Sequence, residues 1–475
     1  MTRILSVTSE CVPLVKTGGL ADVAGALPGA LKPLGYDMRT LLPGYRSVMK
    51  ALKKTRTVLD EDDLFGGPVR VLEAKVAGLS LYVLEAAHLF DRDGSPYLDA
   101  QGSDFPDNPE RFAALSWIAM RIARDGAKGW APDVVHAHDW QGGFAPYYMK
   151  KNGVDVPSVL TIHNIAFHGL APADRLAGLR LDPADFVAEG FEYWGQIGAL
   201  KAGLQFATAL TTVSPTYARE LTTPEFGMGL DGVLRARSGD LTGILNGIDL
   251  EIWDPRTDPE IVNYKTPRGK GRAKARLRKE FGLPDSDGPL VIVVSRLSHQ
   301  KGLDLLLEAL PAFIDRGGQL ALLGSGDKAL EGAFVKAAEQ ANVAVRIGYD
   351  EALSHRMMAG ADAILVPSRF EPCGLTQLYG LRYGTVPVVA ATGGLVDTVI
   401  PASPMAMRSG VATGLQVSPL TSHALATTLG HLVDLYHDVD AWAMLQSNAM
   451  RQSVGWEASA AEYASLYDRL TAANK

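Results

Sequence analysis

The sequence predicts an α/β protein made of two doubly wound domains with parallel sheets. Short β-branched runs alternate with segments of helical periodicity along the whole chain, which is the pattern of parallel strands covered by helices. The chain has 475 residues, more than one hydrophobic core usually supports. A loop rich in Pro and Asp at 253–259 interrupts the alternation, which then restarts.

The elements follow in the same order in both halves. In the first half, strands are expected at 3–8, 39–42, 81–85, 134–137, 158–162 and 209–213. In the second half, strands are expected at 290–294, 320–323, 343–347, 363–366 and 386–389. A final helix is expected at 457–472, after the Gly455-Trp456 break.

These elements indicate two domains, residues 1–245 and residues 246–455, with the segment 456–475 returning to the first. Ligands of doubly wound sheets bind outside the carboxyl ends of the strands. We therefore expect the domains to face each other across a deep cleft that holds the site.

Composition excludes several classes of protein. Hydrophobic residues make up 47% and charged residues 21%, which is ordinary for a globular protein and argues against extensive disorder. No apolar run approaches the length of a membrane span, and the first residues do not resemble a secretory signal, so we expect a cytoplasmic protein without a membrane partner. Cys11 and Cys373 have no paired spacing, which argues against disulfides and structural zinc.

The charge distribution argues against nucleic-acid binding. The net charge of -7 gives no general attraction to polyanions. The segment 265–279 carries eight basic residues, but its periodicity predicts an amphipathic helix with a solvated face. A phosphate site would therefore have to be built from a few local groups.

The first strand leads into the sequence Lys16-Thr-Gly-Gly-Leu-Ala-Asp-Val23 and then a helix. Gly18 and Gly19 leave room for a ligand to approach the backbone, helix-start amides can hold a phosphate, and Lys16 adds a positive charge. From this motif alone, tight strand-to-helix packing remains an alternative explanation for the two glycines.

The turn after the strand at 290–294 contains Arg296 and Lys301. Two cations in a strand-end loop can neutralise a diphosphate and stabilise the charge that builds on a leaving group. Solvated surface charge is the alternative explanation.

A third loop, Pro367-Ser-Arg-Phe-Glu-Pro-Cys-Gly-Leu-Thr376, follows a buried strand and opens a helix. A free carboxylate beside a diphosphate would repel it, so Glu371 is expected to bind sugar hydroxyls. The amides of Cys373, Gly374, Leu375 and Thr376 are expected to face the phosphates.

These motifs together resemble those of a known family. The Lys16 motif, His138-Asp-Trp140, Thr161-Ile-His-Asn164, Asn246-Gly-Ile-Asp249, the Arg296 and Lys301 loop, and Ser368-Arg-Phe-Glu-Pro-Cys-Gly-Leu375 occur in the order found in bacterial glycogen synthases and plant starch synthases. The resemblance implies the GT-B fold of two Rossmann-like domains. It also implies ADP-glucose as the donor, since the branch that uses it carries the Lys-x-Gly-Gly-Leu motif.

The resemblance implies roles for individual residues. Lys16, Gly18, Gly19, Arg296 and Lys301 match diphosphate-binding positions. Glu371 matches the carboxylate that holds the donor glucose, and His163 matches a histidine beside that sugar. The remaining matches are Asp139, Asn164 and Asn246 for the sugar pocket, Tyr349 for adenine, and Asp22 and Tyr97 for donor or acceptor contacts.

One position departs from the wider fold family. Many GT-B glycosyltransferases carry a second glutamate eight residues after the first, and it holds the ribose. Tyr379 stands there in this sequence. The glycogen synthase branch that it resembles also lacks the glutamate. The ribose contact is therefore left unassigned.

The sequence gives weaker support for metal and stacking sites. His136-Ala-His-Asp139 has metal-like spacing, but no third ligand is apparent and the Arg296 and Lys301 pair supplies positive charge, so no metal is expected. Three Asp-x-Asp strings, at 91–93, 285–287 and 438–440, are short enough to be chance matches. Among the tryptophans, Trp140 is expected to neighbour the site, because it adjoins Asp139.

The function implied is transfer of glucose from ADP-glucose to the non-reducing end of an α-1,4-glucan, with retention and without a cofactor. The alternatives are a glucan phosphorylase-like enzyme, which would need a lysine carrying pyridoxal phosphate, and a glucan-binding paralogue without catalysis. The sequence leaves the oligomeric state open.

Overall fold

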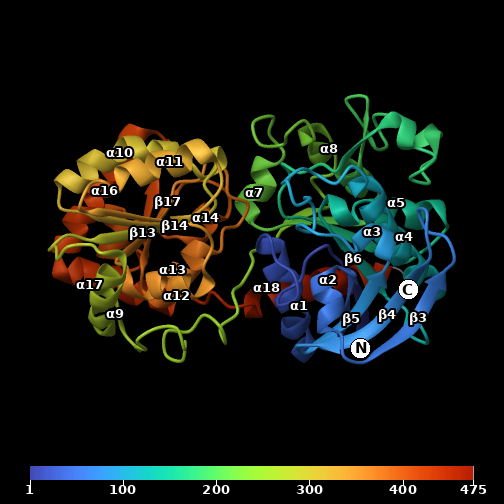
Figure 1. Ribbon diagram of the computed structural model, residues 1–475, viewed down its shortest axis with the longest axis horizontal. Helices are drawn as coiled ribbons and strands as arrows, with labels where there is room; N and C mark the ends of the chain where they lie inside the picture. Colours follow the sequence, from blue (N-terminus) through green and yellow to red (C-terminus); the bar gives the residue numbers. More distant parts are fainter. Residues whose placement is uncertain (474–475) are drawn as a thin grey trace. The chain divides into compact units, whose positions relative to one another are not determined.

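The computed structural model describes residues 1–473, and the chain divides into two compact units (Figure 1). Unit 1 comprises Met1–Asn246 and the segment that begins at Trp456, and unit 2 comprises Gly247–Gly455. Each unit contains a largely parallel sheet with helices packed against it. The predicted α/β class is confirmed.

The main sheet of unit 1 has the strand order β12-β11-β7-β6-β1-β2-β5-β4-β3. Its strands are β1 (Thr2–Val7), β2 (Tyr36–Pro43), β3 (Thr55–Glu61), β4 (Val69–Val76), β5 (Leu79–Glu85), β6 (Val134–His138), β7 (Ser158–Ile162), β11 (Ala209–Thr212) and β12 (Leu241–Gly243). The predicted strands of this half are all present.

The β3 and β4 edge of this sheet is antiparallel, so the expectation of parallel strands is wrong there. Neither strand was predicted from the sequence, because the apolar β-branched runs that predict strands are typical of strands buried on both faces. In β3 and β4 buried residues are mixed with exposed charged ones, as at a sheet edge with one face in solvent.

The helices of unit 1 cover this sheet (Figure 1). They are α1 (Gly19–Leu31), α2 (Arg46–Ala51), α3 (Ala87–Phe90), α4 (Asn108–Asp125), α5 (Phe144–Lys151), α6 (Ala199–Phe206), α7 (Pro215–Glu220), α8 (Asp231–Ala236) and α18 (Glu457–Ala473). A small antiparallel sheet, β8 (Leu170–Pro172), β9 (Glu192–Tyr193) and β10 (Gln196–Gly198), is inserted between β7 and α6.

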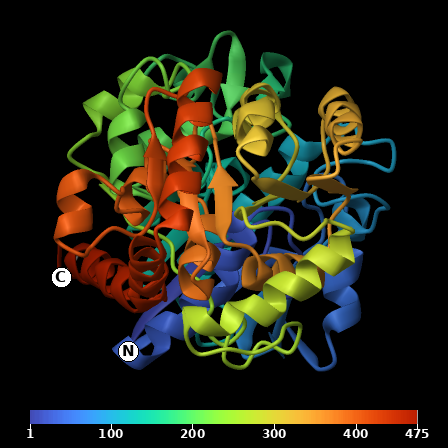
Figure 2. The same ribbon diagram turned by 90° about the vertical axis from the view of Figure 1, so that its left-hand side faces the viewer.

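Helix α18 completes the core of unit 1 and lies beside α1 (Figures 1 and 2). Tyr463 and Tyr467 are fully buried in this core. The Tyr467 hydroxyl is 2.7 Å from Nδ1 of His136 on β6, and the Tyr36 hydroxyl on β2 donates to Asp468 at 2.7 Å. Hydrogen bonds and aromatic burial thus fix the last helix to the central strands.

The sheet of unit 2 is parallel throughout, in the order β15-β14-β13-β16-β17-β18. Its strands are β13 (Leu290–Val294), β14 (Gln319–Gly324), β15 (Val343–Ile347), β16 (Ala363–Val366), β17 (Val386–Ala390) and β18 (Leu415–Val417). The predicted strands are confirmed. Only β18 was not anticipated, because its three residues give no periodicity.

Helices pack against both faces of this sheet (Figures 1 and 2). They are α9 (Lys270–Phe281), α10 (Leu303–Asp315), α11 (Lys328–Ala337), α12 (Glu351–Gly360), α13 (Thr376–Tyr383), α14 (Gly393–Thr398), α15 (Pro404–Arg408), α16 (Ser422–His437) and α17 (Val439–Arg451). Alternate residues of β13 enter opposite cores, Ile292 beside residues of α9 and α12, and Val293 beside residues of α10 and α16.

Helix α9 contains most of the basic segment, and the expected solvated face is wrong at two residues. Lys274 is 14% exposed and pairs with Asp362 at 2.6 Å. Lys270 is 5% exposed, and its Nζ donates to the carbonyl oxygens of Met358, Ala359 and Tyr383 at 2.9–3.2 Å. These carbonyls belong to the last turns of α12 and α13, where helices leave acceptors unpaired. Burial lowers the pKa of Lys270 to about 7.

None of the helices within residues 1–473 combines the length and the apolar character that crossing a membrane requires.

The Tyr467 contact gives a stability prediction. Tyr467→Phe keeps the ring but removes the hydroxyl partner of the buried His136, so the free energy of unfolding should fall by about 1–3 kcal/mol. Thermal unfolding of the purified variant measures this effect. The control is Arg469→Ala on the exposed face of α18, which should leave the melting temperature unchanged. Equal melting temperatures for all three proteins would contradict the role of the hydroxyl.

Candidate active site

In unit 2, the loops after β13 and β16 bring two predicted residues into direct contact. These strands are neighbours, so their carboxyl ends meet. Lys301 Nζ lies 2.5 Å from Glu371 Oε2, and the two side chains are 16% and 9% exposed. From the sequence, Lys301 was predicted to bind phosphate and Glu371 to bind sugar. Without a ligand they form a largely buried ion pair.

A tight contact between the two loops creates this pair. Gly302 follows Lys301 in a left-handed conformation with φ of 64°, and a Cβ there would lie 1.9 Å from the carbonyl oxygen of Pro367. The amide of Arg369 donates to the carbonyl of Gln300 at 2.8 Å, and the Arg369 guanidinium pairs with Asp304 at 2.7 Å. Only glycine allows the loops to approach this closely.

The Glu371 carboxylate has a second partner, the Ser368 hydroxyl, which donates to Oε2 at 2.7 Å. The Glu371 backbone is also fixed, since the Gly394 amide donates to its carbonyl at 3.1 Å. Gly393 has φ of 46° and would place a Cβ 2.0 Å from the same oxygen. The side chain is therefore held in place before any ligand arrives.

Four other predicted phosphate-binding groups of unit 2, the Arg296 side chain and the amides of Gly374, Leu375 and Thr376, are free to bind a ligand. Arg296 is exposed and makes no ion pair or hydrogen bond through its side chain with any described residue. At the start of α13, the amides of Gly374, Leu375 and Thr376 likewise donate to none of the described residues, while Gln377 Nε2 donates to the carbonyls of Cys373 and Gly374. Free amides at a helix start favour anions.

Two tyrosines of unit 2 have opposite environments. Tyr349, which follows β15, is 77% exposed, so its ring is available to a ligand. Tyr379 is 8% exposed and stacks on Trp253 with centroids 3.7 Å apart. Tyr379 is thus a core residue, and the ribose contact remains unassigned.

In unit 1, Asp139 lies at the carboxyl end of β6 and is nearly buried. Its Oδ1 accepts hydrogen bonds from the amides of His163 at 2.6 Å and Asn164 at 3.3 Å. Its backbone has φ of 50°, which is uncommon outside glycine and typical of functional sites. Burial raises the pKa of the Asp139 carboxyl to about 7. Asp139 therefore orients the two residues that follow β7.

His163 belongs to a buried chain of imidazoles. Its Nε2 lies 3.0 Å from Nδ1 of His138, whose Nε2 lies 3.1 Å from the Ser6 hydroxyl. His136 uses both ring nitrogens, toward Tyr467 and Thr161 at 2.7 and 2.6 Å. Burial lowers the pKa of all three histidines, so the rings are neutral at pH 7.

These hydrogen bonds occupy the nitrogens that a metal would need at His136 and His138. Within residues 1–473 the structure has no group of three or more His, Cys, Asp or Glu that could hold a metal ion. The first Asp-x-Asp string is also engaged, since Asp91 and Asp93 both pair with Arg46.

Glu10 is a candidate residue that the sequence analysis missed. It is 3% exposed and follows β1. Its Oε1 accepts from the hydroxyls of Tyr97 and Thr17 at 2.5 Å each, and its Oε2 accepts from the amides of Thr17 and Gly18. The one available signal was its position after the first strand, where ligand-binding loops begin.

Glu10 thus joins Tyr97 to the Lys16 loop, and the rest of that loop is open. Lys16 pairs with Asp22 at 2.9 Å, with side chains 35% and 23% exposed. A Cβ on Gly18 would meet no atom within 4 Å, so packing does not require this glycine. That favours close approach of a ligand over strand-to-helix packing. Gly19 is the first residue of α1.

Asn164 and Asn246 differ in how their side chains are used. The Asn164 oxygen accepts from the amide of Ala166 at 3.0 Å. Asn246 is 8% exposed, and its Oδ1 is buried without a hydrogen-bond partner among the described residues. A buried acceptor without a partner is suited to a ligand hydroxyl.

Trp140 is a packing residue, despite adjoining Asp139. Its ring contacts Phe112 with centroids 4.8 Å apart, and a Cβ on Gly169 would lie 2.3 Å from it. Trp194, at the β9–β10 turn, is instead 81% exposed. Sequence spacing could not distinguish the two environments.

Two doubly wound units, with cations, free amides and a fixed carboxylate after their strands, define a glycosyltransferase that uses an activated sugar. Comparison with known proteins is more specific. Residues 3–236 match the starch synthase catalytic domain, and residues 274–441 match glycosyl transferases group 1. The chain belongs to the glycogen and starch synthase family, and it is an enzyme of that family.

Individual relatives agree with this family. The chain is 60% identical to the glycogen synthase of Paracoccus denitrificans over 474 residues, which cover 99% of this chain and 100% of the relative. It is 59% identical to that of Jannaschia sp., over 98% and 99% of the two chains. The catalytic domain of starch synthase IV from Arabidopsis thaliana, bound to ADP and acarbose, has a TM-score of 0.89 and 31% identity, over 99% of each chain. The predicted resemblance and the GT-B fold are confirmed.

The buried Asp139 carboxyl predicts a pH dependence of stability. Its folded pKa of about 7 exceeds the value near 4 expected in the unfolded chain. Between about pH 4 and about pH 7, folding therefore takes up a proton at Asp139. The stability that this carboxyl contributes declines as the pH rises through this range, by up to about 4 kcal/mol.

Asp139→Asn keeps the shape and cannot titrate. The melting temperature of the original protein minus that of the variant should be larger at pH 5 than at pH 8. Scanning calorimetry at both pH values measures the difference. A constant difference would mean that Asp139 is not protonated in the folded protein below pH 7.

Proposed function

We propose that the chain transfers glucose from ADP-glucose to the non-reducing end of an α-1,4-glucan in the cytoplasm, with retention at the anomeric carbon. The observation that carries the proposal is the loop contact that holds Lys301 against Glu371, while Arg296 of the loop after β13 is exposed. Membership of the glycogen and starch synthase family supports the reaction, and the ADP and acarbose complex of the Arabidopsis relative supports the donor.

The donor diphosphate would be held by unit 2. Arg296 offers a free guanidinium, and the amides of Gly374, Leu375 and Thr376 offer unpaired donors. Lys301 adds a charge that now neutralises Glu371. As the bond to the sugar breaks, negative charge grows on the diphosphate, and prepositioned cations stabilise it more than they stabilise the bound donor.

In unit 2, Glu371 would hold the donor glucose. The carboxylate accepts hydrogen bonds from sugar hydroxyls, and Lys301 lessens its repulsion of the diphosphate. In unit 1, the neutral His163 carries no positive charge that would oppose an oxocarbenium ion, and Asp139 fixes its backbone. The buried Oδ1 of Asn246 is a further acceptor, and the exposed Tyr349 ring would cover adenine.

The reaction we propose proceeds on one face of the sugar. The bond from the anomeric carbon to the diphosphate oxygen breaks while the acceptor 4-hydroxyl oxygen bonds to the same carbon from the same side. The departing diphosphate takes the hydroxyl proton. Glu10 acts as a positioning residue, because it joins Tyr97 to the Lys16 loop.

The most direct test is the initial rate with a short maltooligosaccharide and either ADP-glucose, UDP-glucose or no donor. ADP-glucose should support chain elongation, and UDP-glucose should be the poorer donor. The same assay with glucose 1-phosphate tests the phosphorylase-like alternative. Elongation from glucose 1-phosphate alone, or none from any donor, would contradict the proposal.

The cationic loop gives a second prediction. Arg296→Ala and Lys301→Ala should each lower kcat by about a hundredfold or more, since each removes a charge that stabilises the leaving group. Lys336→Ala, an exposed lysine of the same unit, is the matched control and should be unchanged.

Folding must be checked for Lys301→Ala, because Glu371 then loses its buried partner. Near-normal turnover by a folded Lys301→Ala protein would remove this residue from the mechanism.

A further inference from the structure

A chain of hydrogen bonds leads from the centre of the unit 1 sheet to His163. The Oγ of Ser6 on β1 lies 3.1 Å from Nε2 of His138, the last residue of β6. Nδ1 of His138 lies 3.0 Å from Nε2 of His163. Ser6 and His138 are both fully buried, and the proposed function gives neither of them a role.

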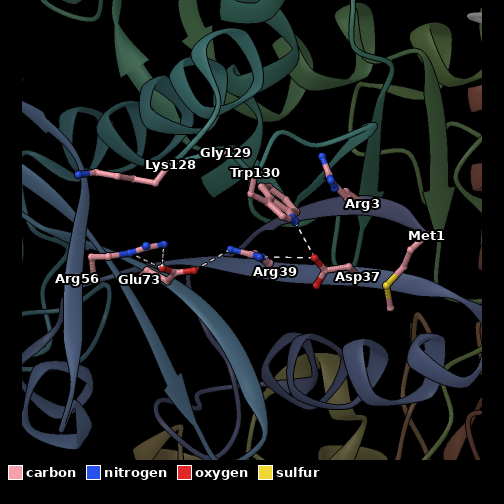
Figure 3. A pocket seen from close by; sticks show the side chains of 9 residues that line it. All are labelled: Met1, Arg3, Asp37, Arg39, Arg56, Glu73, Lys128, Gly129 and Trp130. Atoms are coloured by element: carbon pink, nitrogen blue, oxygen red, sulfur yellow. Dashed lines mark hydrogen bonds and ion pairs between the residues drawn. The ribbon is translucent and has the colours of Figure 1, made fainter.

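Elsewhere in the same sheet, polar side chains are ordered by charge (Figure 3). The Glu73 carboxylate accepts hydrogen bonds from Arg39 Nη1 and Arg56 Nε, both at 2.9 Å. The Asp37 carboxylate accepts from Trp130 Nε1 at 2.7 Å. The chain that ends at His163 has no ion pair, so the direction of its hydrogen bonds is what orders it.

That direction follows from the Ser6 hydroxyl. His138 is the one hydrogen-bond partner that Ser6 Oγ has among residues 1–473. Thr40, the register neighbour of Ser6 on β2, does not serve as a second partner, because its buried Oγ1 forms no hydrogen bond with a described residue. A buried hydroxyl proton needs an acceptor, so Ser6 donates to Nε2 of His138.

The tautomers of both histidines follow from this donor. A neutral imidazole has one N–H and one acceptor nitrogen. Since Nε2 of His138 accepts, its proton is on Nδ1, which donates to Nε2 of His163. His163 therefore also carries its proton on Nδ1. That nitrogen forms no hydrogen bond with any residue in the described part of the chain, so its N–H is left for a ligand.

Burial keeps this order intact near neutral pH. It lowers the pKa of His138 to about 3, and it lowers the pKa of His163 well below the usual value for histidine. Neither ring therefore takes up a second proton, which would turn an acceptor nitrogen into a donor and break the chain.

The neighbouring His136 belongs to a different chain. Its ring nitrogens lie 2.7 and 2.6 Å from the hydroxyls of Tyr467 and Thr161. Its ring contacts that of His138, with centroids 4.2 Å apart, but no hydrogen bond joins the two chains within residues 1–473. A change at Tyr467 therefore disturbs the same cluster without altering the direction of the bonds that lead to His163.

We propose that Ser6 and His138 are positioning residues that hold His163 in the Nδ1–H tautomer, and that this N–H donates to one hydroxyl oxygen of the donor glucose. The tautomer depends on contacts of unit 1 alone, whereas the sugar partner rests on the proposed function. A donor fixed before binding spares the complex the cost of selecting one tautomer. It also requires a lone pair from its ligand, which a hydroxyl has and a protonated amine lacks.

Long-range ¹H–¹⁵N correlation NMR of the full chain, labelled with ¹⁵N-histidine, tests the tautomer without any substrate. In a neutral ring the protonated and the bare nitrogen resonate far apart, so the two tautomers are distinguishable. The signals of His163 are those lost in His163→Gln, and they should show a protonated Nδ1. A protonated Nε2 would overturn the proposal, whatever reaction the protein catalyses.

Three variants test the positioning residues. His138→Phe keeps a ring but removes the donor, so His163 should populate both tautomers and kcat/KM for ADP-glucose should fall about tenfold, the scale of one lost hydrogen bond. His138→Asn places an amide donor near the position of Nδ1 and should recover most of that loss. Ser6→Ala removes only the hydroxyl and should also mix the tautomers of His163, which keeps the test decisive if His138→Phe does not fold. An unchanged tautomer and unchanged kcat/KM in the folded variants would overturn the proposal.

Analogues of ADP-glucose that each lack one glucose hydroxyl test the sugar contact. With one of them the loss caused by His138→Phe should disappear, because the accepting hydroxyl is absent. A loss of the same size with every analogue would mean that His138 acts only on the fold, and it would overturn the sugar contact. Failure of the original protein to use ADP-glucose would contradict the proposed function and leave the NMR result standing.

Two controls separate this role from general destabilisation. Tyr467→Phe weakens the neighbouring chain, and Arg56→Ala breaks an exposed ion pair with Glu73 on the same sheet. Both variants should retain the His163 signals and the kcat/KM of the original protein. A tautomer change in Tyr467→Phe as large as that in His138→Phe would overturn the specific role of His138.

Discussion

The contact between Gly302 and the carbonyl of Pro367 is the constraint on which the site of unit 2 depends. It brings two strand-end loops together and places the Lys301 ammonium 2.5 Å from the Glu371 carboxylate. An ion pair that is largely buried stabilises a protein little, because desolvation offsets much of the attraction. Its value here is geometric, since both groups are held in position before a ligand binds.

The pair also resolves an electrostatic difficulty of sugar transfer. A carboxylate that binds sugar hydroxyls must lie close to the diphosphate of the donor, and the two negative groups repel each other. In the proposed donor complex, Lys301 would lessen that repulsion, and the exposed Arg296 would bind the phosphates. In unit 1, by contrast, burial keeps the histidines neutral, so hydrogen bonds rather than charges order the residues after β6 and β7.

The sequence predicted the fold class, the central strands and the motifs because each follows from a local pattern. Apolar runs mark strands buried on both faces, and polar residues that follow them mark ligand loops. The same reasoning missed β3 and β4, whose buried residues are mixed with exposed charged ones, and it missed Glu10, a single acid after a strand. Lys270 was also predicted to be a surface charge. Its hydrogen-bond partners are carbonyls from α12 and α13, which no local sequence pattern reveals.

The central claim is that the Lys301 and Glu371 pair is a resting arrangement that a donor rearranges. A crystal structure with ADP and glucose tests it most directly. The account predicts that Arg296 and Lys301 both contact the diphosphate and that Glu371 accepts hydrogen bonds from glucose hydroxyls. A diphosphate bound away from this loop, with the Lys301 and Glu371 pair intact and no sugar at the carboxylate, would contradict it.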